Sequence, residues 1–489
     1  MSFSTTKHVS QDPAYLVDSA LRSLTLLNPS LRLDAQQKAV YYPLPTTPDE
    51  QHQQHVAVIS GGGSGHEPSF GGLVGPGLLS AAVCGTIFAS PSSHQILSAI
   101  HRVSTFSNEI LVTVMNYTGD VLNFGMAVEK AKAAEHDLQV EMLVVADDVA
   151  VPRSKFGKVG RRGMAGTVLV QKATGALASL GYGLDDILAV GRLLCHNLAT
   201  IGVALDKVHV PGRDSETFLS HGLAKDEAEI GLGIHNEPGC LRVQGADMEL
   251  SALVRSSLDQ LLNPNDPERA FVKNWSGCPI LMVNNLGGLS VLELGAALTE
   301  VVTQLRETYG MRPNRIISGT FMTSLDCRGF SITLLNDISL AEFGVSHDIP
   351  SLLDHPAGAV GWSHNINSSH RTLDQGQMDG TSGAVYSIYM DALQQYFRAR
   401  APDAIAVDSF FWSKALTNAL SVLAKYTPAR RGDRTLMDTI IPFVETLDKT
   451  QNIGEAIKDA ELGALSTKHM RAGLGRSVSL GFVRFPGRA

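Results

Sequence analysis

The stretch Ile59-Ser-Gly-Gly-Gly-Ser-Gly-His-Glu-Pro68 follows directly on a short β-rich apolar run, His55-Val-Ala-Val-Ile59. Glycine has no Cβ, so successive glycines let the chain take positive φ and let backbone N–H groups come close to a polar ligand. The stretch is not a P-loop, because no Gly-Lys-Ser/Thr follows, and it is not a clean G-x-G-x-x-G. It therefore predicts a ligand-binding turn after a buried strand, with a tight structural turn as the alternative.

Apolar runs alternate with longer helical segments on both sides of this stretch. Further buried strands are expected over 110–114, 140–145 and 279–284, and helices over 121–135 and 291–309. Such an alternation predicts an α/β fold whose ligand chemistry lies on the loops that leave the strand ends.

The pattern changes after Leu335. Residues 356–370 are rich in Gly, Ser, Asn and His and lack both helical and strand periodicity, which is typical of a linker. Beyond them, helical spacing returns over 384–398, 410–425, 436–449 and 453–469. We therefore expect an all-helical domain from about Asp379 to the end.

The composition indicates a globular enzyme of two or three domains: 489 residues, 44% hydrophobic and 18% charged. A net charge of -8 argues against nucleic-acid binding. The five cysteines are scattered without a C-x-x-C pair, which argues against a disulfide scaffold or a thiolate zinc site and for a reducing compartment. The N-terminus lacks a secretory apolar segment and no stretch reaches the length of a membrane span, so a cytoplasmic location is expected.

Two polar loops could carry acid–base or nucleophilic chemistry. In Asn116-Tyr-Thr-Gly-Asp120, the carboxylate at the mouth of a strand could accept a proton from a hydroxyl, or could cap the helix that follows. In Glu229-Ile-Gly-Leu-Gly-Ile-His-Asn-Glu-Pro-Gly239, glycines and a Pro-Gly turn would restrain His235, although most single histidines are ordinary surface or core residues. Asn284-Asn-Leu-Gly-Gly288 is a similar loop that could be turn chemistry alone.

Two motifs in the helical part suit an anion, and no metal site is expected. Asp379-Gly-Thr-Ser-Gly-Ala384 precedes a helix, whose N-terminus favours a phosphate. In Gly432-Asp-Arg-Thr435, Asp433 or Thr435 could cap a helix while Arg434 meets phosphate oxygens. His66-Glu67 is no zincin motif, because H-E-x-x-H would need a histidine at Phe70.

Taken together, these segments resemble the fused, ATP-dependent dihydroxyacetone kinases. The resemblance implies an α/β K-type substrate-binding domain of two α/β subdomains over 7–345, a linker over 346–378, and an incomplete, all-α, L-type nucleotide-binding domain over 379–489. The motifs that carry it are Gly61-Gly-Gly-Ser-Gly-His-Glu-Pro68, Asn116-Tyr-Thr-Gly-Asp120, Gly231-Leu-Gly-Ile-His-Asn-Glu-Pro-Gly239, Asn284-Asn-Leu-Gly-Gly288, Gly380-Thr-Ser-Gly-Ala384, Gly432-Asp-Arg-Thr435 and Gly475-Arg-Ser477.

The resemblance also implies a mechanism. His235 would add to the ketone carbon of dihydroxyacetone and form a covalent hemiaminal, which excludes glycerol because addition needs a carbonyl. His66 would be a hydrogen-bonding acid–base partner, and Asp120 would accept the proton of the hydroxyl that attacks the γ-phosphate of ATP. The triose hydroxyls would lie against Gly63, Ser64, Gly65, His66 and Asp120.

For the nucleotide, the resemblance implies ATP with Mg²⁺. The residues expected to contact it are Thr381, Ser382, Arg434 and Thr435. A homodimer is implied, in which the L-type domain of one subunit faces the K-type domain of the other, with D-glyceraldehyde as a possible second substrate.

The sequence departs from the family pattern in two places. Met115 occupies the position of a lysine that contacts the substrate, and the Asp-Gly-Asp loop that holds Mg²⁺ is absent between Leu335 and Gly380. A non-catalytic triose-binding or regulatory protein therefore stays open as an alternative. A nicotinamide-dependent dehydrogenase ranks far behind, because no acidic residue follows the glycine-rich loop at the right distance.

Overall fold

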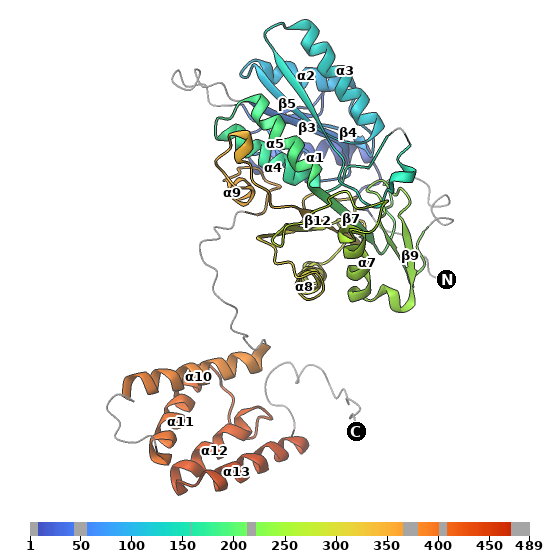
Figure 1. The fold of residues 1–489 in the computed structure, drawn as a ribbon. Coiled ribbons are helices and arrows are strands. Elements are labelled where there is room, and N and C mark those ends of the chain that lie inside the picture. The colour runs from blue at the N-terminus through green and yellow to red at the C-terminus, as the bar shows by residue number, and fades with distance from the viewer. Residues whose placement is uncertain are drawn as a thin grey trace. The chain divides into compact units, whose positions relative to one another are not determined.

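The computed structural model describes residues 8–43, 56–157, 159–212, 222–364, 380–400 and 408–470. The chain divides into two compact units, Met1–Ser368 and Ser369–Ala489 (Figure 1), and each is described by itself. Within the described ranges, every helix is too short or too polar to cross a bilayer.

The first unit contains two six-stranded sheets. In the first sheet the strand order is β1–β2–β4–β3–β5–β6, and the four strands from β4 to β6 are parallel. β1, at one edge, pairs antiparallel with β2, and β2 pairs antiparallel with β4. The strand bounds are β1 Arg32–Asp34, β2 Ala39–Tyr41, β3 Ala57–Ser64, β4 Ala81–Ile87, β5 Glu109–Met115 and β6 Gln139–Val145.

The second sheet is mainly antiparallel. Its order is β11–β10–β12–β7–β8–β9, and only β10 and β11 pair in parallel. This differs from a simple repetition of strand, helix and parallel strand, because β7, β8 and β9 pair in antiparallel fashion. The strand bounds are β7 Leu198–Ala204, β8 Glu227–Ile230, β9 Leu241–Gln244, β10 Ile280–Asn285, β11 Arg315–Gly319 and β12 Gly329–Leu335.

Helices cover both sheets, and one helix lies between them. α2 (Ser93–Ser104) and α3 (Thr118–Ala134) pack on one face of the first sheet, and α7 (Leu250–Leu262) and α8 (Val291–Glu307) pack on the outer face of the second. α4 (Gly166–Ser179) contacts strands of both sheets, and all but its last residue are buried. A helix that is buried on every side marks the centre of the unit. The other α-helices that the structure describes in this unit are α1 Pro13–Leu27, α5 Leu184–His196 and α9 Ile349–Asp354.

The glycine-rich stretch is mostly strand rather than turn, because β3 continues to Ser64. A Cβ on Gly61 would collide with the Val83 carbonyl oxygen, and one on Gly62 would lie 2.6 Å from the Phe70 ring. These glycines are therefore required by the packing inside the sheet. The chain turns only at Gly65, whose φ is +100°.

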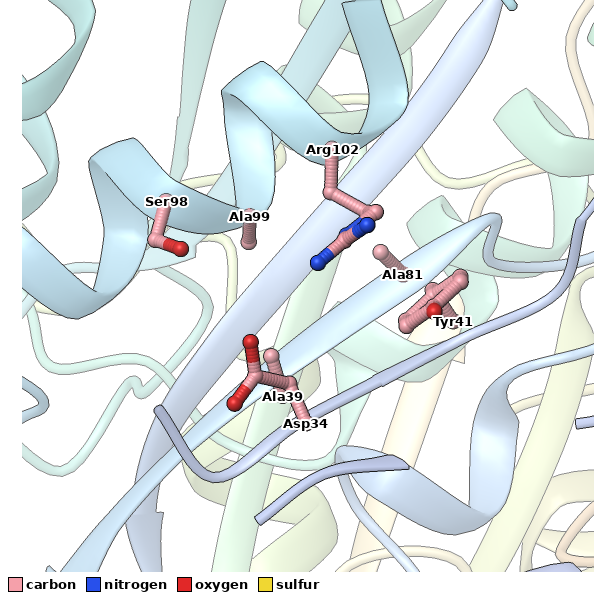
Figure 2. A pocket seen from close by; sticks show the side chains of 7 residues that line it. All are labelled: Asp34, Ala39, Tyr41, Ala81, Ser98, Ala99 and Arg102. Atoms are coloured by element: carbon pink, nitrogen blue, oxygen red, sulfur yellow. The ribbon is translucent and has the colours of Figure 1, made fainter. Parts of the chain in front are cut away.

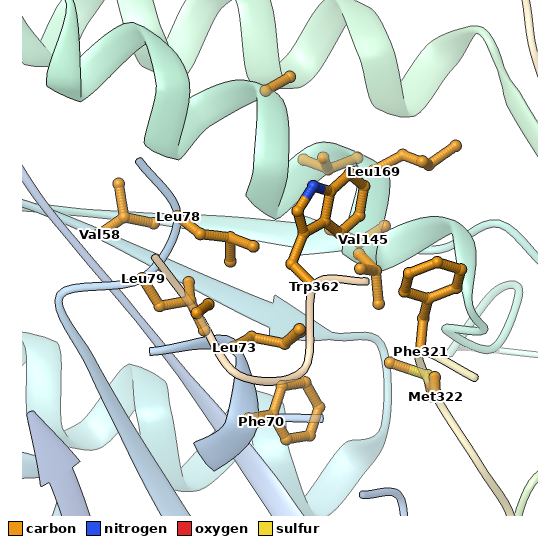
Figure 3. Packing of buried hydrophobic residues seen from close by; sticks show 14 of the residues in the cluster. Val58, Phe70, Leu73, Leu78, Leu79, Val145, Leu169, Phe321, Met322 and Trp362 are labelled. Atoms are coloured by element: carbon orange, nitrogen blue, oxygen red, sulfur yellow. The ribbon is translucent and has the colours of Figure 1, made fainter. Parts of the chain in front are cut away.

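Residues 346–364, which the sequence analysis assigned to the linker, pack onto the first unit instead. Trp362 is 1% exposed and lies 5.3 Å from Phe321, ring centroid to ring centroid, within the apolar cluster of Figure 3. The Gly361 N–H donates to the Gly72 carbonyl at 2.7 Å. Sequence periodicity did not predict this packing, because the segment is held to the first unit by backbone hydrogen bonds to a loop.

Trp362→Ala tests this assignment. Loss of a buried aromatic ring is expected to lower the free energy of unfolding by about 3–5 kcal/mol. Trp412, 41% exposed on the second unit, provides the matched control: Trp412→Ala should change the stability of the first unit little. If denaturant unfolding showed the same loss of unfolding free energy of the first unit in both variants, it would contradict a structural role for residues 346–364.

The second unit is helical where the sequence analysis expected helices. Its helices are α10 Gly380–Arg400, α11 Ser409–Leu423, α12 Met437–Thr450 and α13 Ile453–Ser466. Buried side chains of α10 and α11, with Met437 at the start of α12, form its apolar core. The predicted fold class, an α/β part followed by an all-α part, is confirmed.

Candidate active site

Two histidines from different sheets meet in the first unit. His66 lies two residues beyond β3, and His235 lies in the turn between β8 and β9. Their Nε2 atoms are 3.0 Å apart, although 169 positions separate them in the chain. The fold therefore brings together the two histidines that the sequence analysis singled out.

The backbone fixes the ring of His66. Its Nδ1 lies 2.8 Å from the Thr323 carbonyl oxygen, and only 2% of the residue is exposed. The loop that carries Thr323 is held by Asn284, whose Oδ1 accepts hydrogen bonds from the backbone N–H groups of Phe321 and Met322. Asn284, ambiguous in the sequence, thus supports the position of His66 through this loop.

Glu237 fixes the ring of His235. Its Oε1 lies 3.0 Å from Nδ1 of His235, and its Oε2 accepts the backbone N–H of the same residue at 2.9 Å. A Cβ on Gly233 would collide with this carboxylate, which explains a glycine there. Burial acts to raise the pKa of Glu237, but the hydrogen bonds and charge of His235 outweigh it and lower the pKa to about 2. Glu237 was not predicted, although it stands two residues after His235 in the motif.

The hydrogen-bond partners of the two rings determine which of their nitrogen atoms carry a hydrogen. A carbonyl oxygen only accepts, so Nδ1 of His66 carries a hydrogen. Burial, assisted by the charge of His235, lowers the pKa of His66 to about 3, so this ring is neutral and its Nε2 accepts. The hydrogen between the Nε2 atoms therefore belongs to His235, whose Nδ1 faces the Glu237 carboxylate.

Aromatic rings enclose the histidine pair. Phe88 stacks on His66, with ring centroids 5.1 Å apart and planes 20° apart, and Tyr117 meets His235 edge-on at 4.7 Å. Phe88 and Asn236 both take left-handed φ, of 58° and 66°. The side chain of Asn236 exchanges two hydrogen bonds of 3.0 Å with the backbone of Val208, which holds this costly conformation beside His235.

Asp120 lies inside a helix and does not cap it. α3 begins at Thr118, its N-cap is Tyr117, and Asp120 stands in the first turn with 7% exposure. Its Oδ1 has no hydrogen-bond partner among the described residues. Burial raises its pKa, while a hydrogen bond from Ser90 and the charge of His235 oppose that rise. The carboxyl group is therefore buried close to His235 with one oxygen left for a ligand.

The other expected triose contacts and Met115 are also placed. Gly63 is buried in β3, and the Ser64 hydroxyl donates to the Gly85 carbonyl at 2.8 Å. The N–H of Gly65 donates to Glu67 at 2.9 Å. Met115, at the end of β5, is 3% exposed and belongs to the central apolar cluster.

The expected nucleotide contacts lie at the start of α10 and in the loop before α12. Thr381 and Ser382 lie in the first turn of α10, and their side chains are outside the described part of the structure. Asp438, buried in α12, accepts the backbone N–H groups of Gly432 (2.5 Å) and Thr435 (2.8 Å). These two donors are therefore already paired within the loop.

Another residue occupies the N-cap position of the helix that follows this motif. Neither Asp433 nor Thr435 is the N-cap of α12, which is Leu436. Arg434 takes a left-handed φ of 58°. Gly475-Arg-Ser477 lies outside the described residues.

A small pocket elsewhere in the first unit is separate from the histidine pair (Figure 2). It lies between β2, β4 and α2, and Arg102 stands 5.6 Å from the centroid of the Tyr41 ring. Its lining residues are Asp34, Ala39, Tyr41, Ala81, Ser98, Ala99 and Arg102. None of the expected site residues contributes to it.

Comparison with known proteins identifies the family. A Dak1 domain matches residues 22–359, and a DAK2 domain matches residues 367–484. The chain belongs to the dihydroxyacetone kinase family. The sequence is 34% identical to dihydroxyacetone kinase 1 of Saccharomyces cerevisiae, in an alignment that covers 95% of this chain and 94% of the yeast protein. That alignment runs over 565 positions, more than the 489 residues here, so the yeast kinase has residues that this family member lacks.

Two solved structures of the dihydroxyacetone kinase family are also similar. The dihydroxyacetone kinase of C. freundii, solved in complex with AMP-PNP and Mg²⁺, is 25% identical, with a TM-score of 0.61; the match covers 97% of this chain and 96% of that one. The native form of the same kinase gives a TM-score of 0.59. The dihydroxyacetone kinase operon co-activator DhaQ is 32% identical, with a TM-score of 0.59, over 71% of this chain and 98% of its own. The family thus includes a kinase and a co-activator of similar fold.

Proposed function

We propose that this protein is an ATP-dependent dihydroxyacetone kinase that holds its substrate as a hemiaminal on His235. The observation that carries the proposal is the pair of Nε2 atoms 3.0 Å apart, with Glu237 behind one ring and Thr323 behind the other. A nucleophile and an acid–base partner within hydrogen-bond reach, each oriented by a further group, are the arrangement that addition to a carbonyl requires.

The two histidines can supply and accept every proton that moves in the addition. His235 passes its Nε2 proton to Nε2 of His66, and the freed lone pair bonds to the ketone carbon. The π electrons of the carbonyl move to its oxygen, which takes the proton from His66. In this step His235 begins as an imidazolium and ends as a substituted imidazolium whose Nδ1–H faces the Glu237 carboxylate, so the positive charge lies beside that carboxylate before and after the addition.

Asp120 is proposed as the base for the second step. Its unpartnered Oδ1 would accept the proton of the triose hydroxyl that attacks phosphorus. Burial raises its pKa, which makes it a stronger base than an exposed aspartate. Gly63, Ser64 and Gly65 would border the captured triose. Dihydroxyacetone is the proposed substrate and D-glyceraldehyde a second one, and we propose a cytoplasmic homodimer.

The phosphoryl donor proposed from the family is ATP with Mg²⁺. Among the described residues, no group of three or more His, Cys, Asp or Glu side chains is placed to hold a metal ion. The backbone N–H of Thr435, one of the expected nucleotide contacts, is paired with Asp438. The residues present therefore do not fit the usual Mg²⁺ site, and we derive no step through the nucleotide. Thr381, Ser382, Arg434 and Thr435 remain the proposed nucleotide contacts.

Purified protein with dihydroxyacetone and Mg-ATP tests the proposal. We expect dihydroxyacetone phosphate to appear by coupled assay, and no product from glycerol. Isothermal titration with AMP-PNP and Mg²⁺ provides the second readout. Absence of product together with absence of nucleotide binding would contradict the kinase assignment.

A regulatory triose-binding protein is the second candidate function. It is favoured by the missing carboxylate loop and by the similarity of the first unit to the co-activator DhaQ. In this case, dihydroxyacetone would bind to His235 without turnover. The same two assays separate the candidates, because adduct formation without nucleotide binding fits only the second.

Glu237→Gln tests how the pair is supported. The amide keeps the shape but loses the charge that pairs with the imidazolium, so formation of the triose adduct should weaken about 10-fold or more, as expected for loss of a hydrogen bond to a charged group. Glu227→Gln provides a control, since that carboxylate, at the start of β8, accepts hydrogen bonds from Ala224 and Gln244 and not from the histidine pair. A triose affinity that is the same in both variants would contradict the role of Glu237.

A further inference from the structure

A buried arginine lies beside the turn that carries His235. Nη2 of Arg162 donates to the Gly231 carbonyl oxygen at 2.8 Å, at the start of that turn. A Cβ on Gly233 would lie 2.2 Å from Oε2 of Glu237 and 2.6 Å from Nη1 of Arg162. The guanidinium therefore flanks the same glycine as the carboxylate that orients His235.

Asp148 holds this arginine in place. Its Oδ2 lies 2.7 Å from both Nε and Nη2 of Arg162, and its Oδ1 accepts the backbone N–H of Ala150 at 2.8 Å. The backbone N–H of Asp148 also donates to the Arg162 carbonyl at 3.1 Å. The Asp148 side chain is fully buried, and 14% of the Arg162 side chain is exposed. The guanidinium is thus fixed by contacts to Asp148 and to the turn.

Stability alone does not account for this ion pair. Loss of hydration offsets the attraction between buried charges, so such a pair adds little to the free energy of folding compared with apolar side chains of similar size. Burial acts to lower the pKa of Arg162, but the surrounding charges, that of Asp148 first and that of Glu237 among them, raise it. A permanent cation therefore lies near the Glu237 carboxylate, whose own burial favours the uncharged acid.

We propose that Arg162, held by Asp148, is a positioning residue for capture of the triose, because it keeps the Glu237 carboxylate charged and in place behind His235. The inference rests on the proposed covalent mechanism. Arg162 acts in it through Glu237, whose charge accompanies the cation that the addition leaves on His235. Loss of Arg162 should therefore affect capture only while residue 237 is a carboxylate.

Capture by the full chain tests the inference, with the adduct measured by carbon NMR on triose labelled at the ketone carbon. Arg162→Gln should lower the formation constant of the adduct about 10-fold or more, as expected for loss of a charged contact. Arg162→Lys keeps the charge without the planar fork of donors, so it should recover part of this loss. Arg153→Gln is the control and should capture like the native chain, because this arginine, also between β6 and α4, donates to the 267–270 loop instead.

A double-mutant cycle with Glu237→Gln separates this role from a merely structural one. In the Glu237→Gln background, Arg162→Gln should cost less than about 3-fold, whereas independent effects would multiply. Because Arg162→Gln alone leaves a buried Asp148 unpaired, the second variant combines Arg162→Gln with Asp148→Asn. It should show the same loss of capture. Native-like capture by this combined variant, or effects that multiply across the cycle, would overturn the inference.

Nitrogen NMR of the triose-free chain tests the same inference without any adduct. The Nδ1 resonance of His235, identified by its loss in His235→Gln, reports the hydrogen bond to Glu237. It should shift in Arg162→Gln toward its position in Glu237→Gln, and stay unchanged in Arg153→Gln. An unchanged resonance in Arg162→Gln would overturn the inference. Absence of the adduct in the native chain would instead overturn the proposed function.

Discussion

Replacing His235 by alanine is expected to abolish the triose adduct and to lower kcat/KM at least about 10³-fold. The covalent bond holds the attacking hydroxyl in place, and positioning of this kind supplies several orders of magnitude of rate. The readouts are a coupled assay for dihydroxyacetone phosphate and carbon NMR with triose labelled at the ketone carbon. In the native chain, that carbon should change from a carbonyl to a tetrahedral signal.

The matched control for this variant is His94→Ala. His94 is an exposed histidine on α2. This control should form the adduct and turn over like the native chain. Turnover by His235→Ala at the native rate would remove the covalent mechanism, whatever the state of the histidine pair.

Asp120→Asn is expected to slow phosphorylation and to leave formation of the triose adduct on His235 intact. The amide cannot accept a proton, so kcat should fall about 10²–10⁴-fold, the usual contribution of general base catalysis. The adduct on His235 should still form, because the addition uses only the histidine pair. Asp137→Asn, at an exposed position after α3, is the control and should keep the native kcat. Loss of the adduct in Asp120→Asn would assign this carboxylate to substrate binding instead.

The sequence predicted the positions of the main strands, because their apolar runs are long and buried. The expected strand over 110–114 is part of β5, and the expected strand over 140–145 lies in β6. The four C-terminal helices were equally clear from their 3.6-residue periodicity. The mainly antiparallel second sheet was not predicted, since pairing between distant strands leaves no local signal.

The sequence analysis named the two histidines that the fold brings together, but not the groups that orient their rings. His66, His235 and Asp120 stand in glycine-rich or strand-end motifs, which sequence reasoning detects. Thr323 meets the His66 ring through its carbonyl oxygen, an acceptor that any residue could supply. Glu237 had a detectable signal, as the acidic residue two positions after the proposed nucleophile.

The glycine-rich stretch shows how one pattern can have two causes. Gly61 and Gly62 leave room for a carbonyl oxygen and a phenyl ring within the sheet, and only Gly65 needs its conformational freedom. Asp438 presents the same difficulty in the second unit. Its role in binding the N–H groups of Gly432 and Thr435 depends on how the chain folds back, which spacing alone does not reveal.

The most direct test of the account is a crystal structure of the chain soaked in dihydroxyacetone. We expect continuous electron density from Nε2 of His235 to a tetrahedral carbon, with the new hydroxyl beside Nε2 of His66. Electron density for an unmodified imidazole ring at His235, with the triose bound elsewhere or absent at saturating concentration, would contradict the claim that this histidine bonds to the substrate.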